Sequence, residues 1–150
     1  MDLNGIENYL CDNDKDPSEC NIFWLIGSNK QKKDQFIDSL KTSLTYRMSL
    51  YDNNIITKDT QLLGEVNPIA YTMENKRVLL FRNLKNFSNV DWGILKVLSG
   101  DDSIYIKNQF DLYKIIKLEC SILIESDSDP SQFLSKVMKQ RIQIINMDQL

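Results

Sequence analysis

The chain has 150 residues, of which 42% are hydrophobic, and this length and composition indicate one compact domain. It contains no histidine, which excludes Ser-His-Asp and Cys-His catalysis and any zinc site built on imidazole. Its net charge is only −3, and its longest apolar run, Ile22 to Ile26, has five residues, far fewer than the roughly 20 that cross a bilayer.

Residues 1–20 form an acidic leader with six acids and one base, so the rest of the chain is mildly basic. The leader has no signal-peptide pattern, which predicts an intracellular protein with no membrane partner. In that compartment Cys11, Cys20 and Cys120 are expected to be free thiols. We expect the leader to be a short helix or disordered, and residues 21–150 to form the folded domain.

The first half of the domain predicts alternating strands and helices. Ile22 to Ile26 is typical of a strand buried on both faces, and it ends at Gly27. Apolar residues then recur at helical spacing from Lys33 as far as Met48. The pattern next predicts a weak strand at 54–57, a loop with Gly64 and Pro68, a buried strand at 77–81, and a helix from Asp91 to Gly100.

The second half predicts a hairpin followed by two more strands. Residues 103–107 and 112–118 flank the polar pair Asn108-Gln109, as in a β-hairpin. A third buried strand at 120–124 precedes a helix that starts at Asp129-Pro130 and contains Phe133, Leu134, Val137 and Met138, and a fourth strand covers 141–145. Buried strands alternating with helices predict an α/β fold with a mainly parallel sheet.

A candidate phosphate loop lies between the first buried strand and the first helix. Its sequence is Gly27-Ser28-Asn29-Lys30-Gln31-Lys32-Lys33-Asp34. Against the pattern G-x-x-x-x-G-K-[ST] it keeps Gly27 and Lys33, but Lys32 replaces the second glycine and Asp34 replaces the hydroxyl that ligates magnesium. Lysines are disfavoured at a helix N-terminus, so a phosphate there would be stabilising. The simpler interpretation is an exposed basic turn partly neutralised by Asp34.

Several segments together resemble the core of a superfamily 3 helicase, including the ATPase half of small circular-DNA virus Rep proteins. They are residues 78–84, 91–98, 100–107 and 122–127 with Pro130. The resemblance runs from Ile22 to Ile145 and rests on the order and spacing of the elements. It implies a three-layer P-loop NTPase fold, AAA+-like, with a β-hairpin insertion, ATP and Mg²⁺ as cofactors, and a place in the cytoplasm or nucleus of a host cell.

The sequence departs from this family where the nucleotide would be handled. Arg82 and Asn83 stand where the family has the Walker B acids that hold magnesium, and Asp127 stands where it has an asparagine that senses the γ-phosphate. Together with Lys32 and Asp34, these changes predict that ATP and Mg²⁺ binding is weak or lost, with little or no hydrolysis. We therefore assign no catalytic residue and no metal ligand.

Two basic positions match the family. Lys107 falls where the family's hairpin presents a lysine to single-stranded nucleic acid, and Arg141 falls near arginine fingers that reach a neighbouring subunit's nucleotide. The simpler interpretations are an ordinary hairpin-tip lysine and a strand-edge charge. The resemblance implies single-stranded DNA or RNA, a homo-oligomer or a replication protein as partners.

Three functions stay open at this point. The first is a hydrolysis-deficient helicase-like domain that retains at most nucleotide or single-strand binding. The second is an active ATPase or helicase subunit of a replication assembly, in which acids elsewhere hold the metal. The third is a non-enzymatic scaffold for protein interactions, since a fold does not fix a function.

Overall fold

A computed structural model describes residues 2–12, 22–58, 72–99, 103–107, 110, 113–118 and 120–149. Some sequence predictions lie outside these ranges. The predicted features outside these ranges are most of the second half of the leader, which includes Cys20, the loop containing Gly64 and Pro68, the helix end at Gly100, and the turn Asn108-Gln109.

The centre of the molecule is a parallel sheet in the order β2-β3-β6-β1-β7. The five strands are β1 (Ile22–Ile26), β2 (Met48–Tyr51), β3 (Val78–Phe81), β6 (Ser121–Glu125) and β7 (Ile142–Asn146). All residues of β1, β3 and β6 are buried, as expected for inner strands covered on both faces. The predicted central position of residues 22–26 is confirmed, because β1 pairs with both β6 and β7.

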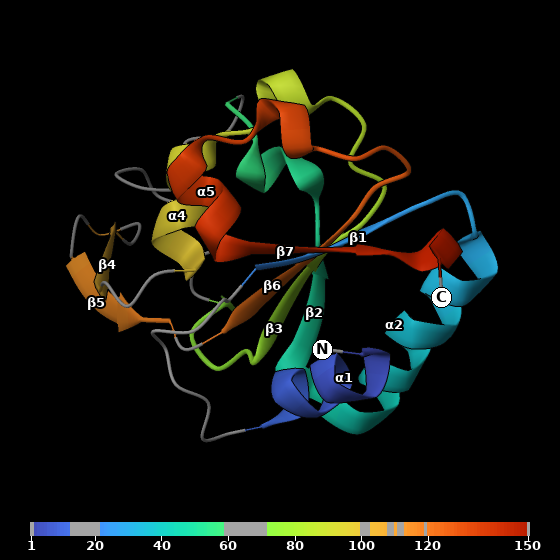
Figure 1. The fold of residues 1–150 in the computed structure, drawn as a ribbon. Helices are drawn as coiled ribbons and strands as arrows, with labels where there is room; N and C mark the ends of the chain where they lie inside the picture. Colours follow the sequence, from blue (N-terminus) through green and yellow to red (C-terminus); the bar gives the residue numbers. More distant parts are fainter. Residues whose placement is uncertain are drawn as a thin grey trace.

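Helices cover both faces of the sheet, which gives three layers (Figure 1). On one face α1 (Leu3–Cys11) and α2 (Lys30–Leu44) pack on alternate strand residues such as Phe23 and Leu25. On the other face α4 (Trp92–Ser99) and α5 (Lys136–Arg141) pack on Trp24 and its neighbours. The alternation of side chains along each strand supplies one core to each helical layer. The predicted α/β three-layer fold with a parallel sheet is therefore confirmed.

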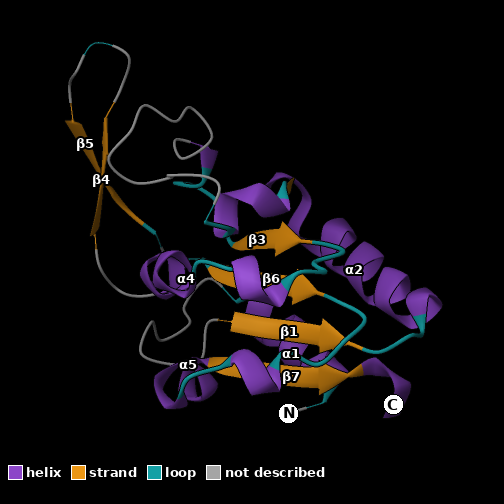
Figure 2. Cartoon of the chain, turned by 90° about the horizontal axis from the view of Figure 1, so that it is seen from above, coloured by secondary structure: helices purple, strands orange, loops and turns teal. Residues whose placement is uncertain are grey.

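The hairpin predicted from the sequence is present and stands apart from the sheet. Strands β4 (Ser103–Lys107) and β5 (Tyr113–Lys117) pair antiparallel, with Tyr105 opposite Ile115. This hairpin projects from the side of the molecule opposite the arrowheads of the parallel strands, far from α2 (Figure 2). The hairpin thus lies away from the carboxyl ends of the parallel strands.

The helix that follows β1 was predicted too long. It ends at Leu44, and Thr45 has a φ of 54°, in the left-handed region where a helix cannot continue. Met48, which fits the helical spacing, instead opens the edge strand β2. The strand predicted at 54–57 is mostly the 3-10 helix η2 (Asn53–Ile56), which buries Ile55 and Ile56.

The helix predicted from Asp129-Pro130 is also wrong in its extent. The structure has a 3-10 turn, η4 (Ser131–Phe133), and a separate α5, because the Ser135 side chain caps the N–H of Met138 at 3.2 Å. Arg141 ends α5 rather than opening a strand. The predicted cap of α4 is confirmed, since Asp91 accepts a hydrogen bond from the N–H of Ile94 at 3.2 Å.

Helix α1 belongs to the packed structure. Ile6 and Leu10 are buried in the cluster that contains the α2 core residues, and the ring of Tyr9 lies 5.6 Å from that of Phe23. Its N-cap is Asp2, which accepts from the N–H of Gly5 at 2.7 Å. No helix in the described parts of the chain is both long and apolar enough to span a bilayer.

Candidate functional site

The candidate phosphate loop lies at the carboxyl edge of the sheet, beside the segment that follows β6. After β1 the chain turns into α2 on one face, whereas after the neighbouring strand β6 it leads to α5 on the other face. Connections that leave adjacent parallel strands toward opposite faces open a crevice where α/β proteins bind ligands. The topology therefore places residues 27–34 and 126–128 side by side at this edge.

The turn between β1 and α2 keeps the geometry of a close backbone approach. Gly27 has a φ of 116°, which an L-residue rarely adopts. Asn29 caps α2 by accepting from the N–H of Lys32 at 3.1 Å. Helix α2 consequently begins at Lys30, so the three lysines predicted at a helix N-terminus do occupy its first turn.

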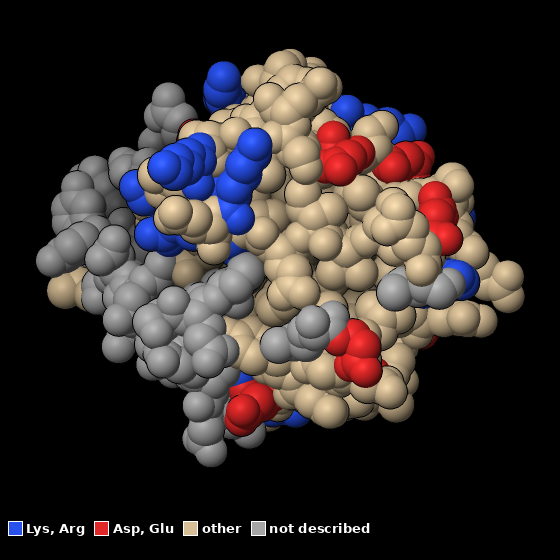
Figure 3. Space-filling model, in the orientation of Figure 1, with Lys and Arg blue, Asp and Glu red and all other residues tan. Residues whose placement is uncertain are grey.

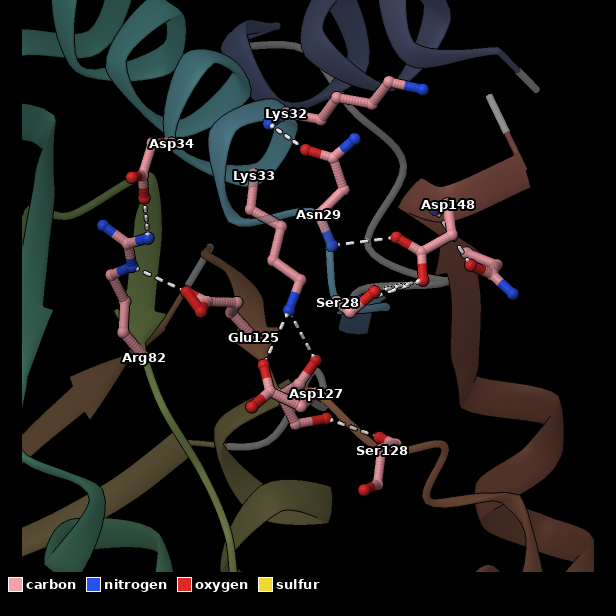
Figure 4. Close-up of polar contacts among 12 residues, drawn as sticks. Ser28, Asn29, Lys32, Lys33, Asp34, Arg82, Glu125, Asp127, Ser128 and Asp148 are labelled. Carbon is pink, nitrogen blue, oxygen red and sulfur yellow. Dashed lines mark hydrogen bonds and ion pairs between the residues drawn. The ribbon is translucent and has the colours of Figure 1, made fainter.

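Lys33 is buried, with 1% of its surface exposed, and it is already bound within the chain. Its ammonium donates to the Ser126 carbonyl at 3.0 Å and to the Asp127 carboxylate at 3.2 Å (Figure 4). Lys32 instead points its ammonium away from these acceptors (Figure 4). Because Lys33 is buried, it does not belong to an exposed basic turn. Its ammonium contacts the carboxylate of Asp127 directly.

Asp148 holds the amides of the turn. Its carboxylate accepts from the N–H groups of Ser28 and Asn29, each at 2.8 Å, and from the Ser28 hydroxyl at 3.2 Å. The hydrogen bonds from the Ser28 and Asn29 amides lower the pKa of Asp148 below its usual value. The turn is therefore an electropositive group of donors that already faces an anion (Figure 4).

Arg82 joins two acids, Asp34 and Glu125, beside the carboxyl ends of β3 and β6. Its guanidinium contacts the carboxylate of Asp34, and its Nε donates to Glu125 at 2.7 Å. The hydrogen bond from Arg82 lowers the pKa of Asp34. Burial opposes the charge of Arg82, but the two acids outweigh it and raise its pKa above the usual value. Asn83, the next residue in the loop after β3, has a φ of 58°.

We call Gly27–Asn29, Lys33, Asp127 and Asp148 the phosphate end of the site, and Asp34, Arg82 and Glu125 its metal end. Magnesium does not fit the metal end, because a guanidinium cation lies between the two carboxylates that could ligate it. No group of three or more acidic or cysteine ligands occurs among the described residues.

The cavity of about 280 Å³ beside Asp127 is lined by residues of the loops after β3 and β6 and by none of residues 27–34.

The remaining predicted residues are not brought to this edge. The backbone of Lys107 ends β4 opposite Tyr113, in the hairpin that lies on the other side of the molecule (Figure 2). Arg141 lies at the amino end of β7, whereas the loop lies at the carboxyl ends. It shares α5 with Lys136 and Lys139, in a region where basic side chains gather over α4 and α5 (Figure 3).

Sequence reasoning did not identify the roles of Glu125 and Asp148 in the site. Glu125 pairs with Arg82, and Asp148 binds the turn. The Ser126 hydroxyl accepts from the indole N–H of Trp24 at 2.7 Å and donates to the carbonyl of Ser128 at 2.8 Å, which fixes the segment after β6. Polar residues directly after buried parallel strands were the available signal, since these strand ends meet at one edge.

The fold has counterparts among solved structures. One is the A form apo structure of the NrS-1 C-terminal region, with a TM-score of 0.67 and 17% identity over 97% of this chain and 34% of that chain. Another covers residues 305–718 of the same region, with a TM-score of 0.59 and 21% identity over 94% of this chain and 32% of that chain. This chain spans about a third of each. No family model and no curated protein matches the sequence.

Proposed function

We propose that this chain is a hydrolysis-deficient, helicase-like module of a viral replication protein, in which the P-loop core serves as a scaffold rather than a motor. Two observations support the proposal. The first is the fold, which this chain shares with the C-terminal region of NrS-1 and which is the α/β fold that the resemblance to viral Rep-type helicases implies. The second observation, which is the main support for the proposal, is that the charged groups of the site already contact each other.

The groups that would handle a nucleotide are bound to other groups of the same chain. Lys33 donates to Ser126 and Asp127, the turn amides donate to Asp148, and Arg82 lies among the acids. Phosphoryl transfer depends on a cation and on donors positioned for the transferred phosphate. Binding Mg-ATP here would require several of these contacts to break, and it would bring triphosphate oxygens near two exposed carboxylates.

The stronger argument against ATP hydrolysis is that the site cannot hold magnesium. A phosphate-bound Mg²⁺ is normally held through a P-loop hydroxyl and a carboxylate. In this chain the corresponding positions carry Asp34 and Arg82, which contact each other. A metal would have to displace a guanidinium that contacts two acids, so we expect neither turnover nor tight Mg-ATP binding.

Melting temperature and ATP turnover test this proposal. We expect Mg-ATP to leave the melting temperature of the wild type unchanged and turnover to stay at the background of a buffer control. Lys33→Ala serves as the site variant. Turnover by the wild type that Lys33→Ala abolishes would overturn the proposal and favour an active subunit.

Short single-stranded oligonucleotides test the residual binding assigned to Lys107. We propose that single strands raise the melting temperature of the wild type and that Lys107→Ala loses this shift. The matched control is Lys41→Ala, which removes an exposed lysine from α2. If neither nucleotide nor oligonucleotide shifts the wild type, the module is a scaffold for protein interactions only.

A further inference from the structure

The Asp148 carboxylate reproduces the contacts of a bound oxyanion. Two backbone N–H groups and one hydroxyl, from Ser28 and Asn29, donate to its two oxygens at 2.8 to 3.2 Å. Backbone N–H groups between a strand and a helix N-terminus are the donors that hold phosphate in P-loop proteins. The turn therefore retains its anion-binding groups, and a side chain of the same protein engages them.

The carboxylate also fills the space that Gly27 leaves. A Cβ atom added to Gly27 would lie 2.9 Å from the Cγ and from Oδ1 of Asp148, closer than such atoms approach each other. The glycine thus permits a close approach to its backbone, as phosphate-binding glycines do. Here the group that approaches is Asp148.

The backbone around Asp148 is anchored, although its side chain is exposed. Met147 is fully buried in the α1–α2 core, and the side chain of Asn146 accepts from the N–H of Asp148 at 3.0 Å. Asn146 itself lies beside Ile26 in the parallel register. Rotation of one exposed side chain would therefore free the turn amides without disturbing the sheet.

We infer that Asp148 is an autoinhibitory anion, which keeps the turn Gly27–Asn29 closed to phosphoryl oxyanions until its side chain is displaced. The inference rests on the proposed function, because it explains how a loop with intact donors avoids phosphate. The ligand class excluded is a phosphate or polyphosphate without metal. Asp127 still pairs with Lys33, so the opened turn would bind through its amides.

Sodium tripolyphosphate without magnesium is the test ligand, titrated calorimetrically into the wild type, Asp148→Ala and Asp38→Ala. Asp38 is an exposed acid on α2, and its removal changes the net charge equally. We expect Asp148→Ala to bind about tenfold more tightly than the other two proteins, the scale of one charge-assisted hydrogen bond. The Ser28 and Asn29 amide NMR signals should shift in that variant alone.

Equal affinity in all three proteins, or no binding to Asp148→Ala, would overturn the inference. Asp148→Asn guards against a folding defect, because it keeps an acceptor oxygen and loses the charge. We expect this variant to bind tripolyphosphate with intermediate affinity. If the folded Asp148→Asn variant bound with the affinity of the wild type, the inference would also be overturned. Since the assay contains neither magnesium nor hydrolysis, its failure leaves the proposed function standing. Wild-type Mg-ATP turnover, in contrast, would overturn the proposed function and the inference with it.

Discussion

The two ends of the site are both made of charged side chains that contact each other, but they differ in burial. At the phosphate end Asp127 is 83% exposed, and Asp148 is exposed as well. At the metal end the side chain of Glu125 is only 4% exposed and that of Arg82 is 21% exposed. The same kind of contact therefore has very different energetic consequences at the two ends.

Exposed ion pairs contribute little, because water and salt screen them. A buried charge that loses its partner is costly, because it stays desolvated. The carboxylates of Asp127 and Asp148 at the phosphate end therefore make contacts that can open, whereas Arg82 and Glu125 at the metal end belong to the folded core. Under the proposed function, the loss of metal binding would be coupled to the stability of the fold, whereas the loss of phosphate binding would not.

Arg82→Ala should have the largest effect on stability. It leaves Glu125 buried without its cation, and we expect the free energy of unfolding to fall by about 3 kcal/mol. Urea denaturation measures this, with Lys85→Ala, an exposed lysine in the same loop, as the control. A loss no larger than that of the control would remove the distinction between the two ends.

Lys33→Met should have a smaller but clear effect. It keeps most of the buried side-chain volume and leaves the Ser126 carbonyl without its ammonium donor, which we expect to cost about 2 kcal/mol. Lys32→Met, one residue away and pointing elsewhere, is the control (Figure 4). Equal denaturation midpoints for the two variants would show that Lys33 is not held in the core.

Asp127→Asn should change stability by about 0.5 kcal/mol or less, because the carboxylate is exposed. Glu125→Gln, on the buried strand next to it, should cost several times more. The pair of variants compares the two ends with the same carboxylate-to-amide change. Similar losses in urea denaturation would contradict the account.

Acid should act on both ends through Asp34 and Asp148, whose pKa values are lowered in the fold by Arg82 and by the Ser28 and Asn29 amides respectively. A lowered folded pKa contributes stability that is present above the unfolded pKa, about 3.9, and is lost as pH falls through the folded value. Stability should therefore fall below about pH 4. Asp148→Asn should flatten that fall, and urea midpoints with an unchanged pH slope would refute this.

The sequence predicted the buried parts of the fold well, because their signals are local. Ile22 to Ile26 reads as an inner strand since every residue is apolar, and Asp91 reads as a cap since its side chain bonds to the next turn. The edge strand β2 was missed because Leu50 is 60% exposed there and Met48 continues the helical spacing of α2.

The site was predicted only in part, because its contacts join distant segments. The sequence singled out Arg82 and Asp127 as departures from the family pattern, but it could not show their partners, because these depend on strand order. Asp148 lies 120 residues from Ser28 in the chain. The two meet only because β7 pairs with β1 in parallel register, which brings their carboxyl ends together.

We propose that the chain's own side chains close the phosphate end of the site in the wild type. The most direct measurement is a Mg-ATP titration followed through the backbone amide NMR signals of Gly27, Ser28 and Asn29. We expect these signals to stay where they are at millimolar nucleotide. Saturable shifts of all three would contradict this proposal.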